Sequence, residues 1–133
     1  MNAGIEMTLQ TLAHRAQRDS KEESVIRLAH EIIAGLNSPS DKVHAFVDEL
    51  HHTTWFGRLI DGSVLEADDA CLFVASCALS IGIPCRFIAE RYGQSWTVRL
   101  GYEVDGQWET IDCMNQVAMR KLDEKVVGEE LRP

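Results

Sequence analysis

Four cysteines carry the thiols that could act as nucleophiles or metal ligands: Cys71, Cys77, Cys85 and Cys113. Their spacing contains no Cys-x-x-Cys pair, and only the first two lie close together in the sequence. Three of the four stand in apolar surroundings, as structural thiols do. We therefore predict reduced thiols in the core, as in a cytosolic protein, with metal binding and disulfides as the open alternatives.

Two adjacent histidines, His51 and His52, are the other candidates for metal binding or for a displaced base. Consecutive residues of a helix point about 100° apart, so the two imidazoles cannot easily chelate one ion. No histidine follows them in the chain. We predict a solvated helix end here, with no metal site and no cofactor.

One apolar stretch organises the elements that must position these groups. Residues 66–87 read EADDACLFVASCALSIGIPCRF. The apolar run of about 13 residues is too short to span a bilayer and is typical of a buried helix. Asp68 or Asp69 can cap its start, while Gly82 and Pro84 can end it. A helix that is apolar on nearly every side has to be covered by the other elements.

Three amphipathic helices are predicted before this stretch. Apolar residues recur at helical spacing within residues 5–16, 25–36 and 43–50. Ser20 with Glu23 forms a capping box for the second helix, and Ser38 followed by Pro39 marks the start of the third.

After Pro84 the apolar period changes from 3.6 to 2, which predicts strands. A short strand covers residues 86–90, and residues 95–104 alternate cleanly before an Asp105-Gly106 turn that favours a type I′ hairpin. The return strand covers residues 107–112. The sequence thus predicts an α+β fold, in which N-terminal helices and a buried central helix pack on a small antiparallel β-sheet.

Length and charge restrict the possible partners. A chain of 133 residues is the size of one domain. The net charge of −8 argues against nucleic acid or an anionic membrane as the main partner. The N-terminal sequence has no signal-peptide pattern, and no run is long enough to cross a membrane.

The order of these motifs resembles the transglutaminase-like domain, a relative of the papain-type cysteine enzymes. The residues that carry the resemblance are Asp68-Asp69 before the apolar helix, Gly82-Ile83-Pro84-Cys85-Arg86, Asp105-Gly106-Gln107-Trp108 and Asp112. The resemblance covers about residues 60–115 as the core, with residues 1–52 as a helical lead-in similar to versions found in bacteriophage gene clusters. The whole chain, 1–133, is then a single domain of this type.

The sequence departs from this family at two catalytic positions. The family's nucleophilic cysteine falls on Ala67, and its histidine, eight residues before the hairpin Asp, falls on Thr97. An engineered replacement of a native cysteine is an alternative origin for Ala67, although it leaves Thr97 unexplained. Asp112 is the remaining triad position, and the predicted hairpin register sets it opposite Arg99, so we expect those two charges to pair.

The resemblance therefore implies a catalytically inactive domain that acts as a binding or structural module, such as a phage assembly protein. We expect a protein partner or a homo-oligomer, in the cytoplasm of a bacterial host or associated with a virion. The alternative is an active thiol-dependent acyl transferase or peptidase with a rearranged site. A third hypothesis is a small-molecule or peptide binder that uses the former cleft. The candidate binding residues are Tyr92, Gln94, Ser95, Arg99 and Asp112.

Overall fold

The structure is a computed structural model that describes residues 3–52, 67–114 and 121–133. Its helices are α1 (Ala3–Asp19), α2 (Glu23–Ile32), α3 (Pro39–His52) and α5 (Ala67–Ser80). Its strands are β1 (Cys85–Tyr92), β2 (Ser95–Val104), β3 (Gln107–Ile111) and β4 (Glu124–Val127), and they form one antiparallel sheet in the order β3-β2-β1-β4. The predicted α+β fold is confirmed. Residues 60–66 and 115 of the predicted core lie outside the described residues.

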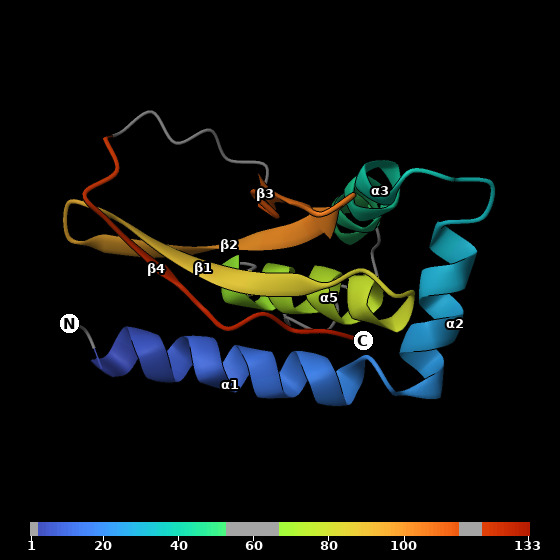
Figure 1. The fold of residues 1–133 in the computed structure, drawn as a ribbon, viewed down its shortest axis with the longest axis horizontal. Helices are drawn as coiled ribbons and strands as arrows, with labels where there is room; N and C mark the ends of the chain where they lie inside the picture. Colours follow the sequence, from blue (N-terminus) through green and yellow to red (C-terminus); the bar gives the residue numbers. More distant parts are fainter. Residues whose placement is uncertain (1–2, 53–66, 115–120) are drawn as a thin grey trace.

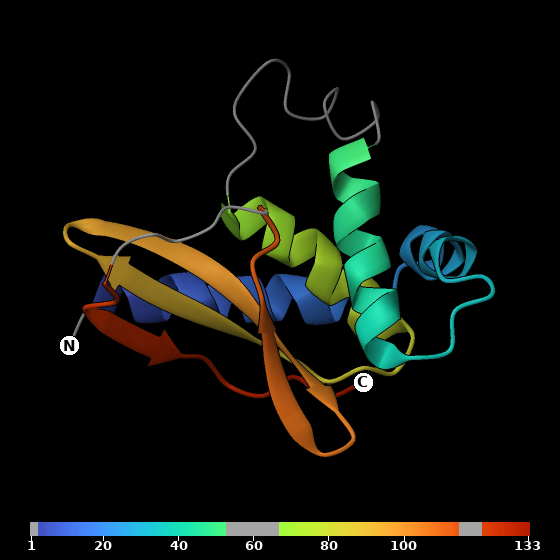
Figure 2. The same cartoon turned by 90° about the horizontal axis from the view of Figure 1, so that it is seen from above.

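Helix α5 is the centre of the fold. It contacts α1, α2, α3, β1 and β2, and Figures 1 and 2 show it lying with α1 along one face of the sheet. Nine of its residues are buried, as expected for a helix that is apolar on nearly every side. Gly82 ends it with a φ of 95°, and the Ile83 N–H donates to Ala78 O at 2.9 Å. None of the described helices is long and apolar enough to cross a membrane.

The two helix starts predicted from Ser20 and Ser38 turn out differently. Ser38 Oγ accepts a hydrogen bond from the Asp41 N–H at 3.1 Å, so this cap is confirmed. The capping box at Ser20 is wrong, because its hydroxyl donates to the Gln17 carbonyl at the end of α1. Helix α2 starts after Glu22, whose side chain makes no cap hydrogen bond.

The hairpin of β2 and β3 has the predicted turn and register. Asp105 and Gly106 have φ values of 51° and 81°, as a type I′ turn requires. Val104 lies opposite Gln107 and Tyr102 opposite Glu109, as expected from that turn. The residues of β2 therefore lie on the faces of the sheet that the predicted register gives them.

The sequence of residues 117–133 does not distinguish between a helix, a strand and a frayed end. In the structure this C-terminal segment adds the edge strand β4. Strand β4 pairs with β1, and beyond it Leu131 forms a bridge to Cys85 and is 1% exposed. Leu131 thus attaches the described part of the tail to the core.

The sheet has two chemically distinct faces. Its helix face carries buried apolar side chains: Phe87, Ala89, Val98, Leu100 and Tyr102. Side chains alternate along a strand, so the neighbours of these residues lie on the opposite face. The opposite face includes Arg86, Ile88, Glu90, Thr97 and Arg99.

Candidate functional site

The start of α5 is the position at which the resemblance places a nucleophile. The helix begins at Ala67, a partly buried residue, and Asp68 and Asp69 lie in its first turn. The acids complement the positive end of the helix dipole, but the methyl group of Ala67 has no lone pair with which to attack a carbonyl. This position cannot supply covalent catalysis.

Cys71 lies one turn further along α5 and is fully buried. Its thiol donates a hydrogen bond to the Val98 carbonyl at 3.4 Å. A hydrogen bond with the Cys113 side chain, followed by burial, raises the pKa of Cys71 well above its ordinary value, and the charges of Asp112 and Asp68 add to this rise. Since the thiolate is the nucleophile, this environment suppresses the reactivity of Cys71.

The other thiols are buried as well. Burial raises the pKa of Cys77 to about 12. Burial also raises the pKa of Cys85, with a smaller contribution from the charge of Cys113. All four cysteines are free thiols. The prediction of reduced core cysteines is confirmed in this respect.

His51 has a role that the sequence analysis missed. Its Nε2 donates a hydrogen bond to the Cys113 carbonyl at 2.7 Å, which joins the end of α3 to the residues after β3. His51 is exposed at the helix end, as predicted, and makes this hydrogen bond in addition. The imidazole lies beside the Cys113 backbone, whereas the Cys113 sulfur belongs to a fully buried residue.

Thr97, at the position expected for the histidine, pairs with Glu90 across β1 and β2. It therefore lies on the opposite face of the sheet, as the alternation predicts. Its hydroxyl cannot act as the base that an imidazole provides in a thiol enzyme.

Arg99 pairs with an acid that the sequence analysis did not identify. Its Nε lies 2.8 Å from Glu90 Oε1, and Glu90 is 6% exposed. Tyr92 donates a hydrogen bond to the same carboxylate oxygen at 3.2 Å. The sequence predicted Asp112 as the partner of Arg99 but gave no signal for Glu90, because the pairing of β1 with β2 was not predicted in register.

Asp112 follows the last residue of β3, directly before Cys113. Its Oδ1 accepts a hydrogen bond from the Met114 N–H at 2.9 Å, which orients the backbone as the chain leaves the sheet. The carboxylate charge also contributes to raising the pKa of Tyr92, behind burial and the charge of Glu90. Asp112 is thus close to both the thiols and the polar cluster around Glu90.

On the same face of the sheet as this cluster, Arg86 stacks on an aromatic ring. Its guanidinium carbon lies 4.4 Å from the centroid of the Trp108 ring. Gly101 makes room for the stem, since a Cβ there would lie 3.0 Å from Arg86 Cγ. The opposite face therefore holds two arginines against neighbouring side chains, Arg99 against Glu90 and Arg86 against Trp108.

The candidate binding residues Tyr92, Gln94 and Ser95 surround the turn between β1 and β2, which projects past the start of α5 (Figures 1 and 2). Gln94 and Ser95 are exposed, whereas Tyr92 is partly buried.

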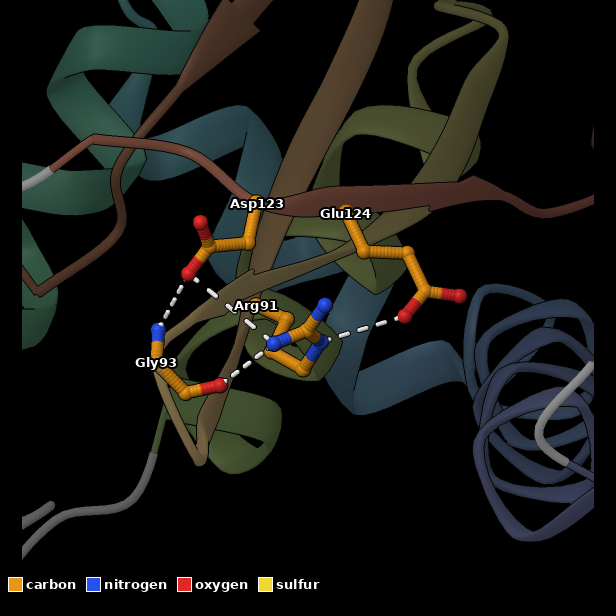
Figure 3. Close-up of polar contacts among 4 residues, drawn as sticks. All are labelled: Arg91, Gly93, Asp123 and Glu124. Carbon is orange, nitrogen blue, oxygen red and sulfur yellow. Dashed lines mark hydrogen bonds and ion pairs between the residues drawn. The ribbon is translucent and has the colours of Figure 1, made fainter.

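Figure 3 shows how the turn is braced. Arg91 lies 3.1 Å from the carboxylate of Glu124 and 3.9 Å from that of Asp123, and it donates to the Gly93 carbonyl. The Gly93 N–H donates to Asp123 at 2.6 Å. The turn is thereby held against the segment that enters β4.

In the described part of the chain, no group of three or more histidine, cysteine or acidic side chains is arranged to hold a metal ion. Comparisons with known proteins give no further assignment. No family model, no curated protein and no solved structure matches the chain.

Proposed function

We propose that this chain is a catalytically inactive domain of the transglutaminase-like type, which serves as a binding or structural module in a bacteriophage assembly. The observation that carries the proposal is Ala67 at the first position of α5. A methyl group occupies the place where such a domain holds its sulfur nucleophile, so the reaction has no attacking atom.

The chemistry on the two faces of the sheet supports the same proposal. Cys71 contacts the strand on the helix face, through Val98. Thr97 and the Glu90–Arg99 ion pair lie on the opposite face. A thiol enzyme needs sulfur, base and orienting acid on one side, within hydrogen-bond reach. The sheet therefore lies between the thiol of Cys71 and Thr97, which occupies the position of the base.

Exposed polar residues at the turn between β1 and β2 suit a contact with a protein partner or a second copy of the chain. Gln94 and Ser95 lie at the turn and are exposed, and the Arg91 brace holds their backbone in place. Their side chains can therefore meet a partner without losing contacts in the fold. Arg99 is already engaged by Glu90, so a ligand would have to compete with that pair.

An acylation experiment tests the absence of catalysis. The chain is mixed with p-nitrophenyl acetate, and release of p-nitrophenol is followed together with the intact mass. We expect no acyl-protein and no burst from the wild type. The variant Ala67→Cys should form one acyl-thioester, because its sulfur would replace an accessible methyl at the helix start.

Two further variants test whether another cysteine acts as the nucleophile. A burst from the wild type that disappears in Cys71→Ser or in Cys113→Ser would show an active, rearranged thiol site and would overturn the proposal. Cys77→Ser is the matched control, because Cys77 is buried in the same helix further from its start. Circular dichroism of each variant establishes that it is folded.

A further inference from the structure

Strand β3 lies at one edge of the sheet. It is the first strand in the order β3-β2-β1-β4, and β2 is the described element with which it has extensive contact. Figure 2 shows the tip of the hairpin of β2 and β3 (orange) projecting away from the helices. An edge strand presents backbone donors and acceptors that can pair with a further strand. In the described part of the chain, one side of β3 is therefore free to pair.

The register shows which backbone groups of β3 point outwards. The Glu103 N–H donates to the Pro84 carbonyl at 3.0 Å, so this residue of β2 is directed towards β1 and away from Trp108, its partner in β3. Hydrogen-bonded and non-hydrogen-bonded pairs alternate in an antiparallel ladder, so Trp108 and Thr110 point outwards, whereas Glu109 between them bonds to β2. Within the described residues, the outward N–H and carbonyl groups of Trp108 and Thr110 make no hydrogen bond.

The opposite edge of the sheet differs from β3 in its charges. Strand β4 carries Glu124 and Lys125, and Glu124 is paired with Arg91 at 3.1 Å. Charged side chains, lysine above all, and proline are the residues with which natural sheets prevent pairing at an edge. Strand β3 reads QWETI, so it contains neither lysine nor proline, and Glu109 is its one charged residue. Of the two edges, β3 is thus the one that lacks this protection.

We propose that two copies of the chain associate by antiparallel pairing of β3, with Trp108 of each copy opposite Thr110 of the other. A strand that pairs with its own copy forms a two-fold interface, in which each copy supplies the groups that the other lacks. In this register the outward N–H and carbonyl groups of both residues are satisfied, and the two four-stranded sheets become continuous. Tryptophan opposite threonine is also a favourable cross-strand pair of an aromatic and a β-branched side chain.

The two Glu109 side chains face each other at the two-fold axis in this register. Glu109 is exposed, and its Oε2 accepts a hydrogen bond from the Tyr102 hydroxyl at 2.8 Å. Like charges directly opposite each other weaken the pairing of two strands. This repulsion limits the affinity of the two copies, so the association should strengthen when the charge of Glu109 is removed.

Sedimentation equilibrium up to millimolar protein concentration tests the proposal, and we expect a monomer–dimer equilibrium. Thr110→Pro removes an outward N–H, and proline is tolerated in an edge strand when its nitrogen faces solvent. This variant should keep a folded circular dichroism spectrum and raise the dissociation constant at least about tenfold. Lys125→Pro, at an exposed position of the other edge strand, is the matched control and should leave the dissociation constant unchanged.

Glu109→Gln tests the register. It should lower the dissociation constant by roughly two- to fivefold, because it removes the like charges at the two-fold axis. A constant that stays the same or rises would contradict this register. A wild type and a Glu109→Gln variant that are both monomeric at every concentration would overturn the proposal, as would a dimer that Thr110→Pro leaves intact. The acylation experiment tests the absence of catalysis separately, since the pairing of β3 does not depend on it.

Discussion

Different interactions stabilise the two faces of the sheet. On the helix face, Leu100 and its neighbours are buried against α5, and thiols take part in this apolar packing. On the opposite face, charged side chains are paired: Glu90 with Arg99, and Arg86 with the ring of Trp108. This contrast supports the proposal that the chain lacks thiol catalysis. The thiol of Cys71 lies in the apolar layer, whereas the Glu90–Arg99 ion pair lies on the opposite face of the sheet.

The largest loss of stability is expected from a substitution on the helix face. Leu100→Ala removes a fully buried side chain from the helix face and should lower the free energy of unfolding by about 2–5 kcal/mol. Thr110→Ala, at an exposed position of β3, should change it by less than about 0.5 kcal/mol. Urea unfolding of both variants measures this. Equal losses would show that the buried Leu100 contributes no more to stability than an exposed position of the hairpin.

The next largest expected effect is a pH dependence of the free energy of unfolding, which arises from the buried thiol of Cys77 in α5. Burial raises the pKa of Cys77 from the model-compound value of 9.0 to about 12. The stability from this group is complete below pH 9 and is lost as pH rises towards 12, since the unfolded thiol ionises first. Between pH 8 and pH 10.5 this thiol should account for a loss of about 2 kcal/mol.

The variant Cys77→Ala isolates that contribution. It removes the ionisable group, so its free energy of unfolding should fall less steeply than that of the wild type over the same pH range. Urea unfolding at the two pH values gives both slopes. Identical slopes would mean that Cys77 ionises alike in the folded and unfolded chains.

The ion pair on the opposite face should have a smaller effect. Glu90→Gln keeps the shape of the side chain but removes the charge that faces Arg99, and we expect a loss of about 1–2 kcal/mol, since the arginine side chain is 24% exposed and partly hydrated. A double-mutant cycle with Arg99→Met measures the coupling. A coupling energy near zero would show that the pair does not stabilise this face.

The brace at the turn should contribute least. Arg91→Ala removes the contacts to Asp123 and Glu124, which are partly exposed, so the expected loss is under about 1 kcal/mol. Lys125→Ala, in the same strand as Glu124 and exposed, serves as the control. The rate of hydrogen exchange of the turn amides should rise in Arg91→Ala and not in Lys125→Ala. An unchanged rate in Arg91→Ala would show that the contacts of Arg91 do not stabilise the turn.

Local patterns in the sequence were sufficient for the central helix and for the hairpin. The apolar run with Gly82 after it, and the Asp105-Gly106 turn within an alternating segment, depend on neighbouring residues, and both were confirmed. The prediction of a capping box at Ser20 was wrong. The Ser20 hydroxyl has backbone carbonyl and amide groups close by in the sequence, and it donates to the carbonyl of Gln17.

Contacts between distant segments were not predictable in the same way. His51 reaches the carbonyl of Cys113, 62 residues away, and nothing in either neighbourhood encodes that pairing. Likewise, the Glu90–Arg99 pair depends on the register of β1 against β2. The edge strand β4 is short and charged, so its alternation is too weak to recognise before its partner strand is known.

The reaction of the folded wild-type chain with iodoacetamide at pH 8 tests the central claim most directly. All four cysteines are buried, so each should react only through opening of the fold, at least about 10³-fold more slowly than in denaturant. One equivalent of thiol that reacts in the native state at the rate of an unfolded cysteine would contradict the account.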